Sequence, residues 1–472
     1  MLEIYGNLVG SISNALYSYI LIILLVGGGI YFTLRTKGVQ FRFLGEAFKI
    51  IFEPKADKDG DSISAFQSMM ISTASRVGTG NIAGVSTAIC FGGPGSVFWM
   101  WLIACLGMAT AFVEGTLAQI YKRRGENGSC YGGPSYYIES VLGKRWLGIA
   151  YAIFMILTYM VGFNLVASFN VADSFKAYGF YNPATTPIIV GIILAAAFGI
   201  CIMGGGKKIA YVSSFLVPIM GGLYIAAAVL VVMLNIKELP GVFGAIFKGA
   251  FDFHAIFGGF AGSCVMMGIK RGLFSNEAGV GAAASAAGSA SVSHPVKQGL
   301  VQVLSVFLDT IVICSCTALF LLCSGVEWTP EIAGMTYVQA AAANLFGQAG
   351  VIFMTISLFL FAFTTLLGNY FYAETGLLYM AGPNGSKKLV IVQRILAIII
   401  VLIGSVLSLN VVWDTADVFM GMMAVINVPV CIILLKPAIK CLNDYIKQKK
   451  EGKNPVFKAA DIDLKQKTDF WN

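Results

Sequence analysis

Charged residues are scarce in this 472-residue chain, because Asp, Glu, Lys and Arg together make up only 12% of it, about half the share of an ordinary soluble domain. No polar block or linker separates the apolar runs, and 57% of the residues are hydrophobic. The composition excludes an ordinary soluble protein and predicts one polytopic membrane domain. A net charge of +8 could suggest nucleic acid as a partner, but the Lys and Arg residues lie in alternate loops, which indicates membrane topology instead.

Histidine is almost absent, and neither His254 nor His294 forms a metal-binding or nucleophile constellation with a nearby Cys or Asp. The ten cysteines lie mostly inside apolar runs and form no CxxC pair, which predicts buried, inert thiols. We therefore expect no enzyme and no organic cofactor. The first residues lack a basic segment and a small-residue cleavage site, so we also expect no cleaved signal peptide.

The chain contains many long apolar runs. A helix needs about 20 apolar residues to cross a bilayer, and runs of this length predict eleven transmembrane helices in an all-α protein. They lie near residues 12–34, 62–90, 96–121, 146–170, 183–204, 209–235, 253–290, 297–325, 345–380, 389–410 and 414–439.

The positive charges predict how these helices cross the membrane. Most of the 32 Lys and Arg residues lie in the loops after the odd-numbered runs and in the C-terminal tail, and such residues collect on the cytoplasmic side. We expect an outside N-terminus, a transmembrane domain over 1–442 and a basic cytoplasmic tail over 443–472. The amphipathic segment 38–55 should lie on the inner membrane surface, with 241–251 as its outer counterpart.

Two of the runs are interrupted near their middle. Residues 71–84, ISTASRVGTGNIAG, contain Gly78, Gly80 and Asn81 at the centre of the run 62–90, and the run 253–290 is interrupted at 268–277, GIKRGLFSNE. Irregular backbone at mid-membrane depth is tolerated only where it is buried in protein or lines a polar cavity. Paired interruptions of this kind indicate the binding site of a transporter.

The two interrupted runs are five helices apart and run in opposite directions, which predicts an inverted repeat of five plus five helices with one extra helix at the N-terminus. An alternative for the first interruption is close helix packing through the GxxxG pair Gly80 and Gly84. A dinucleotide loop is excluded, because no strand precedes Gly78-x-Gly80 and no third glycine has the required spacing.

Several polar residues lie inside the predicted spans. A charge at mid-membrane depth costs roughly 2.5 to 3.5 kcal/mol and is usually functional or paired. Glu277 is therefore a candidate for a site residue or for a residue that supports the site, and Lys270 and Arg271 could partly hold the bend. The alternative is that Lys270, Arg271 and Glu277 pair with one another or cap half-helix ends. Arg76 is also a charge inside a predicted span, and Glu114 or Glu277 is a possible partner for it. Thr364 and Thr365 in the run 345–380 could bind Na+, or could hydrogen-bond back to the preceding turn.

Three stretches carry a family resemblance: SRVGTGNIAGV at 75–85, GGPGSVFWMWLIACLG at 92–107 and KRGLFSNEAGVGAA at 270–283. They resemble the alanine or glycine:cation symporters, also called the sodium:alanine symporter family, over nearly the whole chain. The resemblance implies the inverted-repeat fold of the leucine-transporter type with one extra N-terminal helix. It implies Na+ ligands at the backbone of Ala74 and Val77 and at Thr364 and Thr365, and contacts to the amino acid from Thr79, Gly80, Asn81, Gly272, Ser275, Asn276 and Glu277.

The predicted function is uptake of a small neutral amino acid, alanine or glycine, with Na+ by alternating access across the plasma (inner) membrane. The partners expected are the amino acid, Na+ and the lipid bilayer, with no nucleic acid and no obligate protein partner. An alternative keeps the fold and changes the cargo to another small solute such as a nucleobase, coupled to protons at Glu277 or to Na+. An intramembrane enzyme or receptor lacks support in the sequence.

Overall fold

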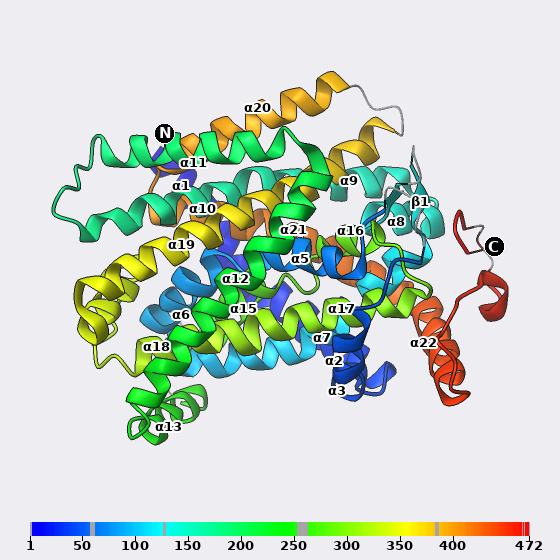
Figure 1. Ribbon diagram of the computed structural model, residues 1–472, viewed down its shortest axis with the longest axis horizontal. Coiled ribbons are helices and arrows are strands. Elements are labelled where there is room, and N and C mark those ends of the chain that lie inside the picture. The colour runs from blue at the N-terminus through cyan, green and yellow to red at the C-terminus, as the bar shows by residue number, and fades with distance from the viewer. Residues whose placement is uncertain are drawn as a thin grey trace.

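The chain folds into a bundle of helices in a computed structural model (Figure 1). The structure describes residues 2–56, 62–125, 129–252, 263–382, 387–464, 466 and 468–471. Within these ranges the only sheet is a short antiparallel pair, β1 (Arg123–Arg124) and β2 (Cys130–Tyr131). The all-α prediction is confirmed at this level.

Seven helical stretches of the described chain are long and apolar enough to cross a membrane, which makes the chain a multi-pass membrane protein. They are Ile4–Arg35, Gly95–Ile120, Arg145–Ala177, Gly205–Leu234, Pro295–Leu322, Met335–Ala381 and Leu409–Ile433. The other four predicted runs correspond to shorter or interrupted helices, so the count of eleven spans stays a prediction. The outward faces are apolar: on α12 (Gly205–Leu234), Ile219, Leu223 and Leu230 are exposed, as expected for a lipid-facing helix.

The named elements of the chain include these long helices and the shorter helices that connect or interrupt them. The N-terminal part contains α1 (Leu2–Ala15), α2 (Gly28–Arg35), α3 (Val39–Arg42), α4 (Leu44–Ile50), α5 (Ala65–Arg76), the π-helical turn η3 (Gly80–Gly84), α6 (Val85–Gly92), α7 (Gly95–Ile120), α8 (Pro134–Leu142), α9 (Arg145–Ile156), α10 (Phe163–Asp173), α11 (Thr186–Ile202) and α13 (Leu239–Ala250). The C-terminal part contains α15 (Cys264–Asn276), α16 (Ala283–Gly288), α17 (Pro295–Val306), η8 (Phe307–Cys314), α18 (Ser315–Leu322), α19 (Met335–Ala381), α20 (Lys387–Gly404), α21 (Leu409–Ile433), α22 (Leu435–Lys450) and η10 (Ala459–Ile462).

The first predicted interruption is present, whereas the second lies later than predicted, because residues 268–276 continue α15 as a regular helix and only Glu277 of the predicted stretch lies outside it. The first lies between α5 and η3, because α5 ends at Arg76 and the next residue, Val77, has a φ of −75° and a ψ of 85° that are not helical. The second separates α15 from α16, and it begins at Glu277, which has a left-handed φ of 55°. Residues 253–262 of the predicted second run lie outside the described residues. The amphipathic segments form α3 with α4 and α13, each too short to span a bilayer.

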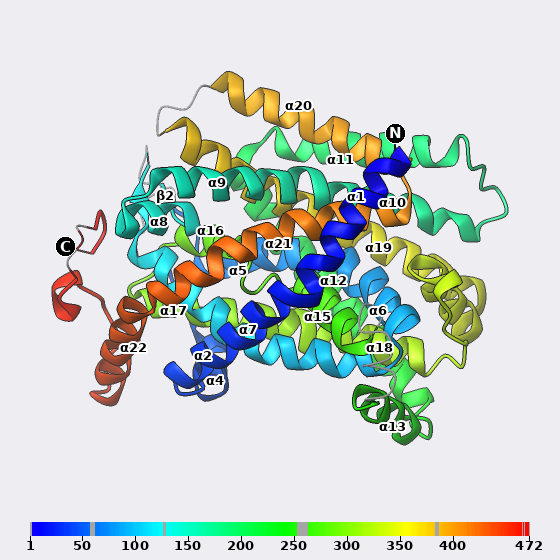
Figure 2. The ribbon, with the colours of Figure 1, turned by 180° about the vertical axis from the view of Figure 1, so that it is seen from behind.

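The interrupted helices lie at the centre of the molecule. α7 packs along both α15 and α17, and α5 packs against α17, α12 and α19. We call α5, α7, α15 and α17 the central helices. α21 packs against α1, α9 and α10 on another side (Figure 2).

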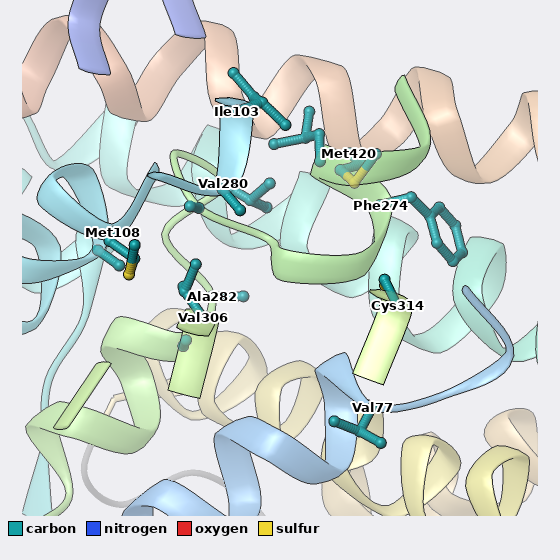
Figure 3. Packing of buried hydrophobic residues seen from close by; sticks show 14 of the residues in the cluster. Val77, Ile103, Met108, Phe274, Val280, Ala282, Val306, Cys314 and Met420 are labelled. Atoms are coloured by element: carbon teal, nitrogen blue, oxygen red, sulfur yellow. The ribbon is translucent and has the colours of Figure 1, made fainter. Parts of the chain in front are cut away.

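The apolar core surrounds the two interruptions. Figure 3 shows Val77 beside the first interruption and Val280 and Ala282 within the second, with Phe274 and Cys314 nearby. Side chains from η8, α7 and α21 complete this cluster. Tight packing holds α15 to α7, because a Cβ added at Gly272 would lie 2.6 Å from Ile103 Cγ2. The core therefore fixes the irregular backbone on several sides.

Candidate functional site

The first interruption is held open by its own asparagine. The Gly78 N–H donates to Asn81 Oδ1 at 2.8 Å, and the Asn81 N–H donates to the Gly78 carbonyl at 3.2 Å. Only glycine fits at residue 78, because a Cβ there would lie 2.1 Å from Thr365 Oγ1 of α19. The sequence GTGN thus forms a compact turn where a continuous helix would otherwise run.

The second interruption is an irregular stretch from Glu277 to Ala282. Gly279 and Gly281 adopt φ values of 98° and 89°, which side-chain-bearing residues rarely adopt. Asn276 Oδ1 accepts a hydrogen bond from the Ala278 N–H at 3.0 Å, whereas Asn276 Nδ2 is buried without a partner among the described residues. This stretch therefore has one asparagine that stabilises the turn and still has free donors.

The two interruptions meet. Asn81 Nδ2 donates to Ser275 Oγ at 3.1 Å, and Ser75 Oγ donates to Glu277 Oε1 at 2.9 Å. Gly80 lies directly against Phe274, since a Cβ there would come within 2.8 Å of its ring. The prediction that the two broken helices lie together is confirmed by these contacts.

A buried carboxylate that sequence reasoning missed joins the two breaks. Asp309 of η8 is fully buried and accepts hydrogen bonds from Asn81 Nδ2 at 2.8 Å and from Ser275 Oγ at 2.7 Å. Its position in an apolar run, FLDTIVIC, was the available signal, because a charge inside a span is rarely without a function. Asp309 therefore holds the side chains of Asn81 and Ser275 in place.

The predicted Na+ ligands are only partly brought together. Thr365 Oγ1 donates to the Ala74 carbonyl at 3.1 Å, so a hydroxyl of α19 and a carbonyl of α5 lie side by side. Thr364 Oγ1 instead donates to the Leu360 and Phe361 carbonyls at 3.1 and 3.0 Å. This is the back-bonding alternative that the sequence left open.

A small cavity lies between the first break and α19. Its lining is a mixture of polar and aromatic side chains and glycines: Ser75, Arg76, Gly78, Thr79, Gly80, Phe163, Phe274 and Thr365. Phe274 packs against Phe163 and Trp413, with ring centroids 4.4 and 4.6 Å apart. Of the predicted contact residues, Thr79 and Gly80 line this cavity, whereas Gly272 faces Ile103 and Met100 of α7.

Arg76 is buried beside this cavity. The hydrogen bond that it donates goes to neither candidate from the sequence, although its charge acts on both Glu114 and Glu277. Its Nη1 donates to Gln302 Oε1 of α17 at 3.1 Å. Its Nε and Nη2 have no hydrogen-bond partner among the described residues. Glu114 bonds Asn427 of α21 at 2.6 Å instead.

The two cations of α15 form ion pairs with acids of α21 and not with Glu277. Lys270 Nζ lies 3.0 Å from Asp417 and 3.4 Å from Asp414, and Arg271 Nη2 lies 2.5 Å from Asp417. Both acids belong to α21. The buried cluster therefore fastens α15 to α21, with Ser13 of α1 also bonded to Lys270 at 2.9 Å.

The polar groups at the two breaks come mainly from uncharged side chains and from the backbone. No group of three or more His, Cys, Asp and Glu side chains gathers in the described part of the chain. Hydroxyl, amide and carbonyl oxygens dominate both breaks, and helix ends supply unpaired backbone groups. Such groups suit a small zwitterion and a hard cation.

Comparisons with known proteins agree with this geometry. A family model described as the sodium:alanine symporter family matches residues 2–459. A probable sodium/glutamine symporter, GlnT of Bacillus subtilis, is 44% identical over 97% of this chain and 94% of its own length. The sodium/alanine symporter AgcS of Methanococcus maripaludis is 37% identical over 95% of this chain and 99% of its own.

A solved structure extends the comparison to the fold. MhsT, crystallised in complex with L-phenylalanine, superposes with a TM-score of 0.52 at 15% identity and covers 87% of this chain and 94% of the MhsT chain. At this low identity the likeness shows a shared fold alone.

Proposed function

Because the chain belongs to the sodium:alanine symporter family, we propose that it takes up alanine or glycine together with Na+ by alternating access. Family membership makes it a transporter and not an enzyme, and supports symport of a small amino acid with a cation. The observation that supports a small cargo is the close packing beside the first break, where Phe163 and Phe274 leave little free space next to Gly78 and Gly80. The packed rings of Phe163 and Phe274 favour a short side chain over that of glutamine.

The cargo would be bound mainly by loosened backbone. The first turn of η3, at Thr79, Gly80 and Asn81, would present N–H groups and a positive dipole end to the carboxylate. Ser275, Asn276 and Glu277 would bind from the second break. Glu277 Oε2 is buried with no partner among the described residues, so it can accept a hydrogen bond from the ammonium group.

Gly272 supports the same site indirectly. Because Gly272 has no side chain, α15 can approach Ile103 of α7. This approach positions Ser275 and Asn276, which lie one helical turn further along α15, at the second break. We therefore assign Gly272 to positioning and no longer to direct contact with the amino acid.

Na+ would bind at the carbonyls of Ala74 and Val77 with the hydroxyls of Thr364 and Thr365. The 3.1 Å contact between Thr365 Oγ1 and the Ala74 carbonyl supports this site. The bonds that Thr364 donates to α19 use its proton and leave oxygen lone pairs available for a cation. Na+ would thus link α19 to the first break.

Ion binding would order the first break against α19, and the central helices would then rock against the rest. We place the chain in the plasma membrane with eleven spans, a five-plus-five inverted repeat and an outside N-terminus. One Na+ moving down 100 mV supplies roughly 2.3 kcal/mol, and a tenfold gradient about 1.4 more. Together these support an accumulation of several hundredfold for a neutral solute.

Proton coupling at Glu277 is the second candidate, because this carboxyl is fully buried and only one of its oxygens is bonded. Uptake of labelled alanine into proteoliposomes separates the two. An inward Na+ gradient should drive uptake, and unlabelled L-alanine and glycine should compete better than glutamine. Uptake driven by a pH gradient in Na+-free buffer would favour the second candidate, and glutamine as the best competitor would refute the choice of cargo.

A further inference from the structure

The segment after α22 is anchored to the protein and is not a free basic tail. We call residues 454–464 together with 468–471 the C-terminal strap. Its apolar side chains are covered: Phe457 is 3% exposed, Ile462 4% and Trp471 7%. Figure 1 shows this red segment beside α22 and β1, at the end of the molecule away from the N-terminus. A merely solvated tail would not bury three large side chains.

The first anchor of the strap is the connection between α16 and α17. The Phe457 N–H donates to the Ser293 carbonyl at 3.0 Å, and Ser293 Oγ donates to the Pro455 carbonyl at 2.8 Å. The Phe457 ring packs edge-on against His294, with centroids 5.3 Å apart. Lys297 Nζ, near the start of α17, donates to Asn454 Oδ1 at 2.7 Å.

The second anchor is the end of α7. Trp471 Nε1 donates to the Gln119 carbonyl at 2.8 Å, and Lys122 Nζ lies 4.8 Å from the centre of the Trp471 ring. Arg124, two residues further, donates through Nε to the Asp469 carbonyl at 2.9 Å. The Phe457 and Trp471 rings contact each other at 5.4 Å, so the two anchors form one unit.

These anchors belong to helices that the transport cycle has to move. Both α7 and α17 are central helices, and the strap follows α22, which itself packs against α7 and α17. α22 in turn follows α21, which packs against α1, α9 and α10. The strap therefore connects the two groups of helices at the end of the molecule where the C-terminus lies. The stretch matched by the family model ends at residue 459, so the Trp471 anchor lies beyond it.

We propose that the C-terminal strap is a built-in restraint that holds α7 and α17 against α22 and slows opening of the transporter toward the side of its C-terminus. Release of Trp471 and Phe457 frees the central helices to swing. This inference rests on alternating access in the proposed function but does not depend on which solute is carried.

The test measures access to Ser72, a fully buried residue of α5 that bonds Gln302 of α17. Ser72→Cys would be labelled by a thiol reagent applied from the C-terminal side of the membrane, with the chain lacking this substitution as the background for native cysteines. Trp471→Ala should raise the labelling rate about tenfold or more, the factor that corresponds to 1.4 kcal/mol. The matched control is Val456→Ala, since this strap residue is 57% exposed and its truncation should change nothing.

A cross-link keeps the proposal testable if Trp471→Ala does not fold. Ser293→Cys with Phe457→Cys places thiols at two backbone-paired positions, and their oxidation should slow labelling of Ser72→Cys until a reductant is added. Labelling that is unchanged both by strap release and by the cross-link would overturn the proposal. Faster labelling after release in a protein that does not carry alanine would support the strap while refuting the proposed cargo.

Discussion

Gly78→Ala is the most informative perturbation of the proposed ion site. A Cβ at this position would lie 2.1 Å from Thr365 Oγ1 and 3.1 Å from Thr365 Cβ. Ordinary contacts begin near 3.4 Å, so the first break and α19 would have to separate by more than 1 Å. That movement would pull the Thr365 hydroxyl away from the Ala74 carbonyl, which it now contacts at 3.1 Å.

The expected loss follows from the cost of overpacking, about 1–3 kcal/mol. If all of this cost falls on ligand binding, affinity drops by about 5- to 150-fold. The assay is binding of labelled alanine to purified protein as a function of Na+ concentration. Gly78→Ala should shift the Na+ curve to higher concentration and weaken alanine binding at any fixed Na+.

Two further variants make this assay decisive. Gly222→Ala is the matched control, because no atom lies within 4 Å of a Cβ at that position of α12, and it should bind as the wild type does. Adding Thr365→Ala to Gly78→Ala removes the 2.1 Å contact with Oγ1 and leaves only the 3.1 Å contact with Cβ. The double variant should regain most of the lost stability, but not Na+ affinity, because the hydroxyl is lost. Wild-type Na+ and alanine affinities in Gly78→Ala would refute the placement of the site.

Three other predictions follow from the buried polar contacts. Asp417→Asn leaves the two cations of α15 without their shared acid and should destabilise the protein by about 3–5 kcal/mol, measured by thermal unfolding in detergent; Asp414→Asn should cost less, since its side chain is 24% exposed. Burial, followed by the nearby charge of Lys297, lowers the pKa of His294 from 6.5 to about 3. A lowered histidine pKa gives stability that is complete above pH 6.5 and is lost as the pH falls toward 3, so unfolding temperatures measured from pH 7 to pH 4 should fall less in His294→Gln than in the wild type, and equal slopes would contradict this. Asn276→Ala removes the acceptor for the Ala278 N–H and should abolish Na+-driven alanine uptake into proteoliposomes; near-normal uptake would show that the second break is not the binding site.

Local backbone chemistry made the two breaks predictable. The glycines at 78 and 80 predicted the first break, and the structure leaves the helix just before them, at Val77. The second break was predicted too early, because the charged stretch before Glu277 continues α15 and the chain leaves the helix only at Glu277. Hydropathy also located the amphipathic segments that form α4 and α13. These features depend on residues close together in the sequence, so a single chain reveals them.

Tertiary partners could not be read in the same way. Asp309 contacts Asn81, which is 228 positions away in the sequence. The residues around each of them do not predict this contact. The acids of α21 that hold Lys270 and Arg271, and Gln302 beside Arg76, were missed for the same reason. Composition identified the C-terminal segment only as a basic tail and did not predict the buried contacts of Phe457 with the start of α17 and of Trp471 with α7.

The central claim is that the two interrupted helices together bind an amino acid in a Na+-dependent way, and Asn81 tests it most directly. This side chain bonds Gly78 in the first break and Ser275 beside the second. Binding of labelled alanine should be measured for purified wild type and Asn81→Ala, with Na+ and with K+ in its place. The account predicts binding by the wild type only in Na+ and none by Asn81→Ala under either condition; wild-type binding that is equal in K+, or undiminished binding by Asn81→Ala, would contradict it.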